Sequence, residues 1–192
     1  MLKWLSPIFL SVLLAGCEDP NWHTSDISDI MPELDLSLMN ENGQQVEEDA
    51  YIGKTTLLYF GYTHCPDVCP TSLARMTAAI KKLDEPARDD IQVLFVSVDP
   101  ERDTPARLRQ YTDVFGPQFI GLTGSTAQLD ALTNRYRVSY GYGEKDENGN
   151  YDVSHSSGIF VFNEQGDARL LMRNSDPIPS MVSDLQRLME RG

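Results

Sequence analysis

Cysteine, histidine and basic residues are scarce in this sequence. Its 192 residues include three Cys and three His, and 16 Lys and Arg stand against 29 Asp and Glu, which gives a formal net charge of −13. So few Cys and His exclude a cluster-rich protein such as a ferredoxin, but they suffice for one small metal or redox site. The shortage of Lys and Arg argues against a nucleic-acid-binding protein, because affinity for phosphate backbones comes from those side chains.

The sequence also lacks a second hydrophobic run beside the one near its start. The apolar stretch 4–15 follows Lys3 and is about a dozen residues long, whereas a bilayer span needs roughly 20. It ends in Leu14-Ala15-Gly16-Cys17, the residue order of a bacterial lipobox. We therefore expect residues 1–16 to be a lipoprotein signal peptide, Cys17 to receive the lipid, and 17–30 to be a flexible tether. An ordinary signal peptide with an incidental Cys is the alternative. Either way the domain is exported, and a lipid on Cys17 would hold it on a bacterial membrane, facing the periplasm.

The rest of the chain, residues 31–192, has the composition and pattern of one globular α/β domain. Over the full sequence, hydrophobic residues make up 41% and charged residues 23%, as in a globular protein. Apolar runs and turn signals predict a leading hairpin and then alternating strands and helices. The expected strands are 34–38, 44–46, 55–62, 91–98, 118–122, 158–162 and 168–172, and the expected helices are 72–83, one starting at 105, 126–136 and 179–189. This order predicts a central mixed sheet flanked by helices on both faces, with an N-terminal β-hairpin. A Cys pair between the first buried strand and its helix lies where a thioredoxin-like fold has its active site.

Two of the three cysteines form a pair between the first buried strand and its helix. Cys65 and Cys69 are four residues apart, so both sulfurs can lie on one side of a helix start. The helix N-terminus favours thiolate over thiol, which predicts a lowered pKa. Pro70 has no N–H, so we expect regular helix to begin near Cys69 and residues 65–69 to be an exposed turn. Such a pair can form a disulfide or bind a metal.

A third ligand would have to come from the three histidines. His23 falls in the expected tether, and His64 adjoins Cys65 in a turn where neighbouring side chains point apart. His155 directly precedes an apolar strand, at a point of a thioredoxin-like sheet that lies near the Cys pair. The residues alone leave His155 open between a ligand and a structural histidine.

The motifs together resemble the Sco/SenC family. The resemblance is carried by FGYTHCPDVCP at 60–70, VSVDPERDTP at 96–105, GLTG at 121–124 and His155 before a hydrophobic strand, and it covers 31–189. The family consists of thioredoxin-like, membrane-tethered copper proteins that assist assembly of the copper A centre of cytochrome c oxidase. The resemblance implies Cys65 and Cys69 as thiolate ligands and His155 as the imidazole ligand of Cu(I) or Cu(II). It implies as partner the subunit that carries copper A, or another periplasmic copper acceptor. Soft thiolates and an imidazole suit copper, although zinc accepts them too.

The sequence departs from the family's pattern at two points. Ser154 stands where the family commonly has Asp before its His, and lipid on Cys17 would replace a transmembrane anchor. The acidic turn of Asp99, Glu101 and Asp103 matches the family, but we interpret it as a solvated loop that caps the next helix.

Besides copper delivery, the sequence leaves other functions open. A thiol–disulfide oxidoreductase would use Cys65 as the attacking thiolate and Cys69 as the resolving one, and would not need His155. It would keep the cysteines of the copper acceptor reduced. A redox or copper sensor is a further alternative, and a thiol peroxidase is disfavoured because its usual sequence context is absent.

Overall fold

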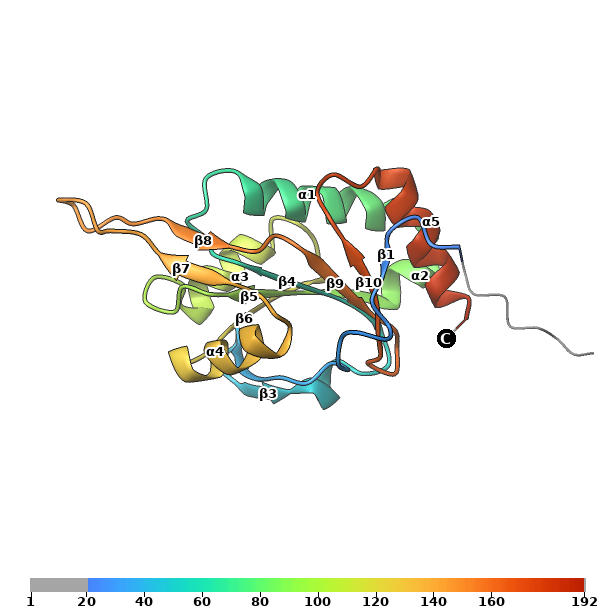
Figure 1. The fold of residues 1–192 in the computed structure, drawn as a ribbon, viewed down its shortest axis with the longest axis horizontal. Coiled ribbons are helices and arrows are strands. Elements are labelled where there is room, and N and C mark those ends of the chain that lie inside the picture. Colours follow the sequence, from blue (N-terminus) through green and yellow to red (C-terminus); the bar gives the residue numbers. More distant parts are fainter. Residues whose placement is uncertain (1–20, 192) are drawn as a thin grey trace, which may run out of the picture.

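A computed structural model describes residues 21–191, so the expected signal peptide and Cys17 lie outside the described residues. An eight-stranded sheet forms the centre, in the order β1-β10-β9-β4-β5-β6-β2-β3 (Figure 1). Strands β4 (Thr55–Gly61), β5 (Ile91–Ser97) and β6 (Phe119–Thr123) run parallel, while β9 (Ile159–Phe162) and β10 (Ala168–Met172) are antiparallel. The mixed sheet expected from the sequence is confirmed.

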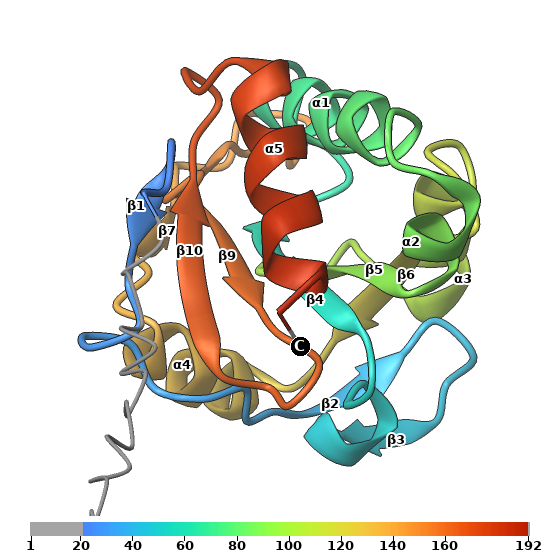
Figure 2. The same cartoon turned by 90° about the vertical axis from the view of Figure 1, so that its right-hand side faces the viewer.

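Helices cover both faces of this sheet. They are α1 (Val68–Ile80), α2 (Glu85–Asp89), α3 (Pro105–Thr112), α4 (Thr126–Arg135) and α5 (Ile178–Met189), with a 3-10 turn η1 (Glu48–Ala50). Successive side chains of a strand point to opposite faces, so β4 sends Tyr59 toward α1 and Phe60 toward α4. Helices α1 and α5 lie together on one side of the sheet, and α4 lies on the other (Figure 2).

The predicted helix starts follow local chemistry. Thr104 caps α3 by accepting a hydrogen bond from the Arg107 N–H, and Pro105 occupies the first helical position, as expected. Helix α1 begins at Val68, one residue before the expected start, and Pro70 falls in its first turn, where a missing N–H is tolerated. The short helix α2 was not anticipated.

The N-terminal hairpin is confirmed with shifted bounds. Strands β2 (Ser37–Asn40) and β3 (Gln45–Glu47) are antiparallel, and β2 also pairs with β6, which places the hairpin at the edge of the sheet. Gly43 in the turn has a φ of +75°, a left-handed backbone that glycine adopts without strain.

Residues 21–30 are not a flexible tether, contrary to the sequence-based expectation. Strand β1 (Ser25–Asp26) pairs with β10, and Ile27 is buried. The fully buried Asp184 of α5 accepts hydrogen bonds from the N–H and the hydroxyl of Thr24, both at 2.8 Å. The pairing of β1 with β10 and the hydrogen bonds to Asp184 hold residues 21–30 against the domain, although their polar composition is that of a linker.

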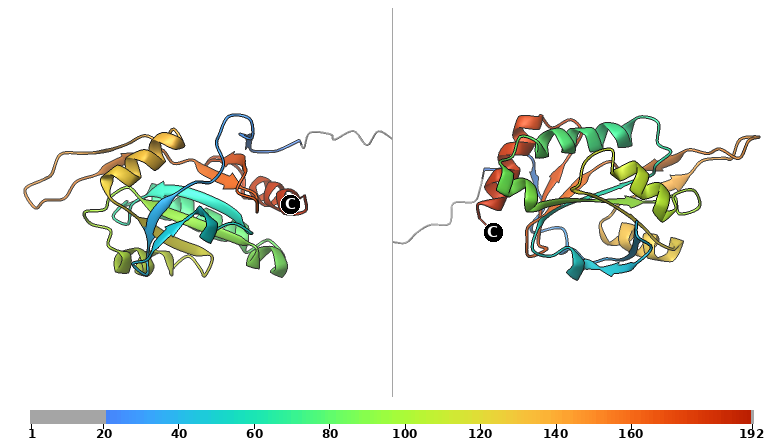
Figure 3. Two further views of the ribbon diagram at one scale, coloured as in Figure 1. Left: turned by 90° about the horizontal axis from the view of Figure 1, so that it is seen from below. Right: turned by 180° about the vertical axis from the view of Figure 1, so that it is seen from behind.

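A second, two-stranded sheet was also missed. Strands β7 (Tyr140–Tyr142) and β8 (Val153–His155) form a hairpin around the charged loop at 144–150. Figures 1 and 3 show that it projects from the molecule at the end opposite to β1 and the C-terminus. No helix within residues 21–191 combines the length and apolar character needed to cross a bilayer.

Candidate metal centre

Three separate elements bring Cys65, Cys69 and His155 together. Cys65 lies in the turn after β4, Cys69 lies in the first turn of α1, and His155 ends β8. Sγ of Cys69 is 3.2 Å from Nε2 of His155, and the N–H of Cys69 donates to Sγ of Cys65 over 3.4 Å. All three ligand atoms lie within 4.8 Å of one another.

This spacing fits one metal ion. Bonds of roughly 2.3 Å to sulfur and 2.0 Å to nitrogen, as for zinc, place sulfur and nitrogen atoms about 3.5 Å apart on a shared metal. Both Cys65 and Cys69 are free thiols. Two thiols and one imidazole are soft to intermediate donors, so the set suits copper or zinc better than a hard cation such as Mg²⁺.

The cysteine turn is only partly exposed, whereas the sequence predicts an exposed turn. Pro66 and Asp67 are exposed as expected, but the two cysteines are buried, with Cys65 8% and Cys69 0% exposed. Burial raises the pKa of the Cys69 thiol well above its ordinary value, which overturns the expected lowering by the helix N-terminus. A metal that binds here must therefore displace the proton of Cys69, and its own charge supplies the stabilisation of the thiolate.

His155 is oriented for coordination by its backbone neighbour. Its Nδ1 lies 3.0 Å from the carbonyl oxygen of Ser156, and since a carbonyl only accepts, Nδ1 carries the hydrogen and donates it. In the neutral imidazole Nε2 then keeps its lone pair, which faces the Cys69 sulfur. Burial lowers the pKa of His155, which favours this neutral form. Such a fixed tautomer is typical of metal-ligating histidines.

Two tyrosines form the wall behind the imidazole. The rings of Tyr59 and Tyr62 meet the His155 ring edge-on, with centroids 6.1 and 6.0 Å away. Because these contacts come from β4 and the turn after it, they restrict the His155 ring on the side facing the sheet.

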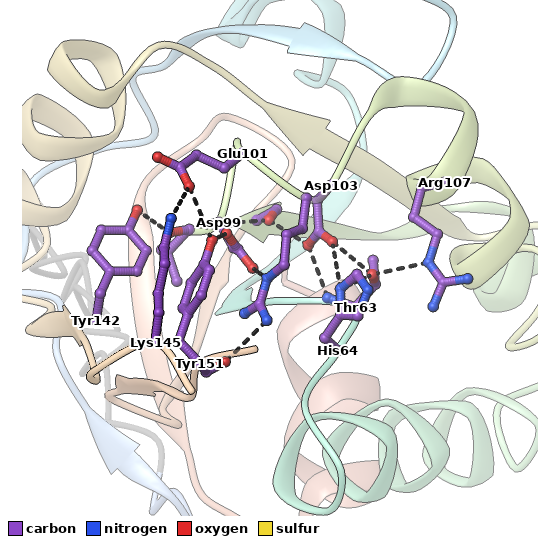
Figure 4. Close-up of polar contacts among 12 residues, drawn as sticks. Thr63, His64, Asp99, Glu101, Asp103, Arg107, Tyr142, Lys145 and Tyr151 are labelled. Carbon is purple, nitrogen blue, oxygen red and sulfur yellow. Dashed lines mark hydrogen bonds and ion pairs between the residues drawn. The ribbon is translucent and has the colours of Figure 1, made fainter. Parts of the chain in front are cut away.

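A buried carboxylate anchors the start of the cysteine turn. The N–H and hydroxyl of Thr63 donate to Asp103 over 2.8 and 2.6 Å, and the Ser97 hydroxyl donates to the same carboxylate over 2.6 Å (Figure 4). Asp103 is 1% exposed. It therefore fixes the turn two residues before Cys65 and does not face solvent.

The neighbouring Asp99 is equally buried, so the solvated-loop interpretation of the acidic turn is wrong for both aspartates. Asp99 accepts hydrogen bonds from the Tyr151 hydroxyl at 2.7 Å and from Nε of Arg102 at 2.5 Å, as Figure 4 shows. These contacts join the turn after β5 to the β7–β8 hairpin. Glu101 is exposed and pairs with Lys145 at 3.1 Å, as a solvated residue would.

The other histidines lie away from the cysteine pair. His64 points to the Asp103 side, where its Nδ1 is 3.5 Å from Oδ1 of Asp103 and its side chain is 42% exposed. Although His64, Asp99 and Asp103 could be grouped as metal ligands, both carboxylates already accept hydrogen bonds from protein donors. His23 is exposed beside α5.

Ser154, the departure from the family's pattern, is on the opposite side of β8 from His155. Its hydroxyl donates to the carbonyl oxygen of Gly141 over 3.2 Å, across the hairpin. Strand alternation alone separates it from His155. The missing carboxylate therefore does not leave a gap in the set formed by the two thiols and the imidazole.

Sequence reasoning missed two supporting features, the Asp103 anchor and the hairpin that carries His155. A signal for the hairpin was present in the short runs Tyr140–Tyr142 and Val153–His155 on either side of a Gly- and Asn-containing loop. Nothing in the sequence of Asp103 distinguishes a buried anchor from an exposed helix-start residue.

The fold and these residues define a thioredoxin-like protein with a candidate centre of two thiols and one imidazole. The chain belongs to the SCO1/SenC family, whose model matches residues 31–190. The mouse mitochondrial SCO2 homologue is 38% identical over 160 residues, which is 80% of this chain and 63% of the relative. The chain thus spans less than two thirds of that relative's length.

Solved structures confirm the fold. The crystal structure of Arabidopsis thaliana ScoI with copper bound has a TM-score of 0.77 at 34% identity, and the match covers 83% of this chain and 99% of that one. At 23% identity, the likeness of two others shows the fold alone. A SCO1/SenC family lipoprotein from Bacillus anthracis has a TM-score of 0.68 and covers 83% and 96% of the two chains. BsSco, described as a Sco-family cytochrome c oxidase assembly protein with a disulfide switch, has a TM-score of 0.62 and covers 81% and 92%.

Proposed function

We propose that this chain binds copper through Cys65, Cys69 and His155 and delivers it to the copper A site of cytochrome c oxidase during assembly. The observation that carries the proposal is the 3.2 Å approach of the Cys69 sulfur to the free lone pair of His155, beside a second thiol. Copper bound in the Arabidopsis relative supports the choice of metal. Membership of the Sco family, which is described as a family of cytochrome c oxidase assembly proteins, supports the oxidase as acceptor.

Delivery, as opposed to storage, suits a site with few ligands. Three protein ligands leave a coordination position open, so a ligand of the acceptor can attack the metal before the first ones leave. The site lies at the end of the molecule that bears the projecting β7–β8 hairpin (Figure 1). That end is away from β1, where the chain enters the domain.

Lipid anchoring on a bacterial membrane, with the domain in the periplasm, is part of this proposal. It rests on the residue order Leu14-Ala15-Gly16-Cys17. That a structurally similar family member is a lipoprotein supports it. The carbonyl oxygen of Asn21 accepts a hydrogen bond from the Arg187 guanidinium of α5 over 2.6 Å. Only residues 18–20 would therefore separate a lipid on Cys17 from this contact. Mass spectrometry of the membrane-extracted chain tests this, and an unmodified Cys17 would overturn it.

Copper binding by the reduced chain tests the ligand assignment. Wild type should bind one copper per chain, and the Cu(II) form should show a sulfur-to-copper charge-transfer band. His155→Ala should lose stable copper, whereas His64→Ala is the matched control and should keep it, since the exposed His64 faces Asp103. Native copper affinity in His155→Ala would show that the assignment is wrong. A site that prefers Zn²⁺ in direct competition would overturn the choice of metal.

The free thiols also favour a second candidate function, reduction of a disulfide in the copper acceptor. Cys65, the more exposed sulfur, would attack as thiolate and form a mixed disulfide, which Cys69 would resolve. The products are a reduced acceptor and a Cys65–Cys69 disulfide, so two electrons pass from this chain. His155→Ala should spare this exchange, whereas Cys65→Ser should abolish both exchange and copper binding. Reduced wild type that holds no copper but exchanges disulfides rapidly would favour the oxidoreductase.

A further inference from the structure

Tyr59 has a buried hydroxyl without a hydrogen-bond partner among residues 21–191. The residue is 0% exposed on β4, and its hydroxyl oxygen neither donates to nor accepts from any described group. An unpaired buried hydroxyl destabilises a fold, and phenylalanine would fill the same space without that penalty. The hydroxyl therefore does not stabilise the metal-free fold, which suggests that it forms a hydrogen bond in another state of the protein.

The Tyr59 ring borders the sulfur of Cys69. A Cβ atom added at Gly61 would lie 2.9 Å from Sγ of Cys69 and 3.2 Å from Cε1 of Tyr59, the ring carbon next to the hydroxyl-bearing one. Sulfur and ring edge thus line the same small space, which glycine leaves open. The ring also meets the imidazole of His155 at an angle of 88°. Tyr59 therefore lies beside the Cys69 sulfur and packs against His155, two of the three proposed ligands.

The hydroxyl is available as a donor at neutral pH, because a phenol keeps its hydrogen there. Ser72 is the other polar side chain beside this hydroxyl. Its hydroxyl already donates to the Val68 carbonyl at 2.8 Å and accepts from the Asn174 amide at 2.7 Å. A neutral thiol is a weak acceptor, but a metal-bound thiolate is a strong one.

We propose that the Tyr59 hydroxyl donates a hydrogen bond to the Cys69 sulfur when that sulfur is a copper-bound thiolate, and that this bond favours Cu(I) over Cu(II) in the site. The inference rests on the proposed function. A donor at a ligating sulfur withdraws negative charge from it, and the Cu(I) complex carries one more negative charge than the Cu(II) complex. The donor therefore stabilises Cu(I) more, as hydrogen bonding around a cysteine sulfur does at other copper sites.

Tyr111 supplies a matched control. Its hydroxyl is also buried without a partner among the described residues, and its ring packs on Phe95 with centroids 5.3 Å apart. It interacts with the Cys69 sulfur only through longer-range electrostatics. Tyr59→Phe and Tyr111→Phe thus remove the same atom from the same side of the sheet, and only the first removes the proposed bond.

The test uses the full chain, reduced and loaded with copper. The affinities for Cu(I) and Cu(II) are measured against competing chelators, and the charge-transfer band is recorded for the Cu(II) form. Tyr59→Phe should lower the ratio of Cu(I) to Cu(II) affinity by about tenfold. It should also move the band to longer wavelength, because sulfur electrons are then easier to transfer. Tyr111→Phe should leave both quantities at their wild-type values, and the metal-free Tyr59→Phe chain should unfold at no lower temperature than wild type.

The outcomes separate this inference from the proposed function. Copper binding that depends on His155 but is the same in Tyr59→Phe and wild type would overturn the hydrogen bond alone. Equal changes in both tyrosine variants would overturn it as well, since they would reflect general polarity near the site. A metal-free Tyr59→Phe chain that is less stable than wild type would show that the hydroxyl has another partner. Wild type that binds no copper would overturn both proposals.

Discussion

Thr63 and Asp103 are joined by two hydrogen bonds, one from the threonine N–H at 2.8 Å and one from its hydroxyl at 2.6 Å. These bonds connect the turn before Cys65 with the start of α3, because Asp103 directly precedes Thr104, the N-cap of that helix. A third donor, the Ser97 hydroxyl, completes the shell of this carboxylate. The position of the first cysteine thus depends on a residue from another element, after the neighbouring strand.

Asp103→Asn should lower both stability and copper affinity. An asparagine presents one oxygen and one NH₂ group where three donors converge, so at least one buried donor loses its acceptor. We expect a loss of about 1–3 kcal/mol in the free energy of unfolding, measured in urea, and weaker Cu(I) binding by chelator competition. Asp113→Asn, at an exposed residue after α3, is the control and should change neither. Native copper affinity in Asp103→Asn would refute the anchoring role.

The stability of the metal-free chain should fall as the solution is acidified through the range in which His155 titrates. Burial lowers the pKa of His155 from its ordinary value of 6.5. Below that value the unfolded state binds a proton that the folded state resists, so the free energy of unfolding decreases with falling pH until the folded-state pKa is passed. One such proton contributes at most about 1.4 kcal/mol per pH unit. Urea titrations of wild type and His155→Gln check this, and the variant should show the shallower slope between about pH 7 and 5.5. Equal slopes would contradict the prediction.

The sheet was predictable because its central strands bury both faces. Runs such as Thr55–Gly61 and Ile91–Ser97 consist of apolar residues and β-formers, and such runs have few alternatives. The prediction for residues 21–30 was wrong because a polar composition is found in edge strands as well as in linkers. Its conformation is decided by a distant partner, the Asp184 carboxylate, which no local pattern reveals.

In the candidate site, too, local relations were predictable from the sequence and long-range ones were not. Spacing places Cys65 and Cys69 together, since four residues at a helix start fix their relation. The approach of His155 depends on the β7–β8 hairpin, 86 residues further along the chain from Cys69, and the residues alone left it open. The burial of the two cysteine side chains was also unpredictable, because it depends on packing against other elements, whereas the exposure of Pro66 and Asp67 agrees with the expected turn. The resemblance to the family predicted His155 as a ligand, whereas the residues around it did not distinguish a ligand from a structural histidine.

Ser154→Asp should restore the family's common acidic residue with little effect on the metal. Ser154 is exposed and faces Gly141 across the hairpin, on the side away from His155. A charge there is screened by solvent, so Cu(I) affinity should stay within about threefold of wild type. Chelator competition at low and high salt measures it. A tenfold or larger change would mean that this residue acts on the site directly.

Gly61→Ala should disrupt the site more than any exposed substitution near it. The added methyl group would lie 2.8 Å from Cε2 of Phe95 and 2.9 Å from Sγ of Cys69, closer than real contacts allow. Both neighbours are fully buried and cannot move freely. We expect a loss of about 1–3 kcal/mol in stability from overpacking, and a loss of copper affinity as the sulfur is pushed from its position facing His155. Gly141→Ala is the control, because its methyl group meets only the Ser154 hydroxyl, at 3.5 Å. Thermal unfolding and copper competition on both variants check the prediction. A Gly61→Ala chain that is less stable but keeps native copper affinity would show that the Cys69 sulfur is free to shift, and that the site tolerates what the packing forbids.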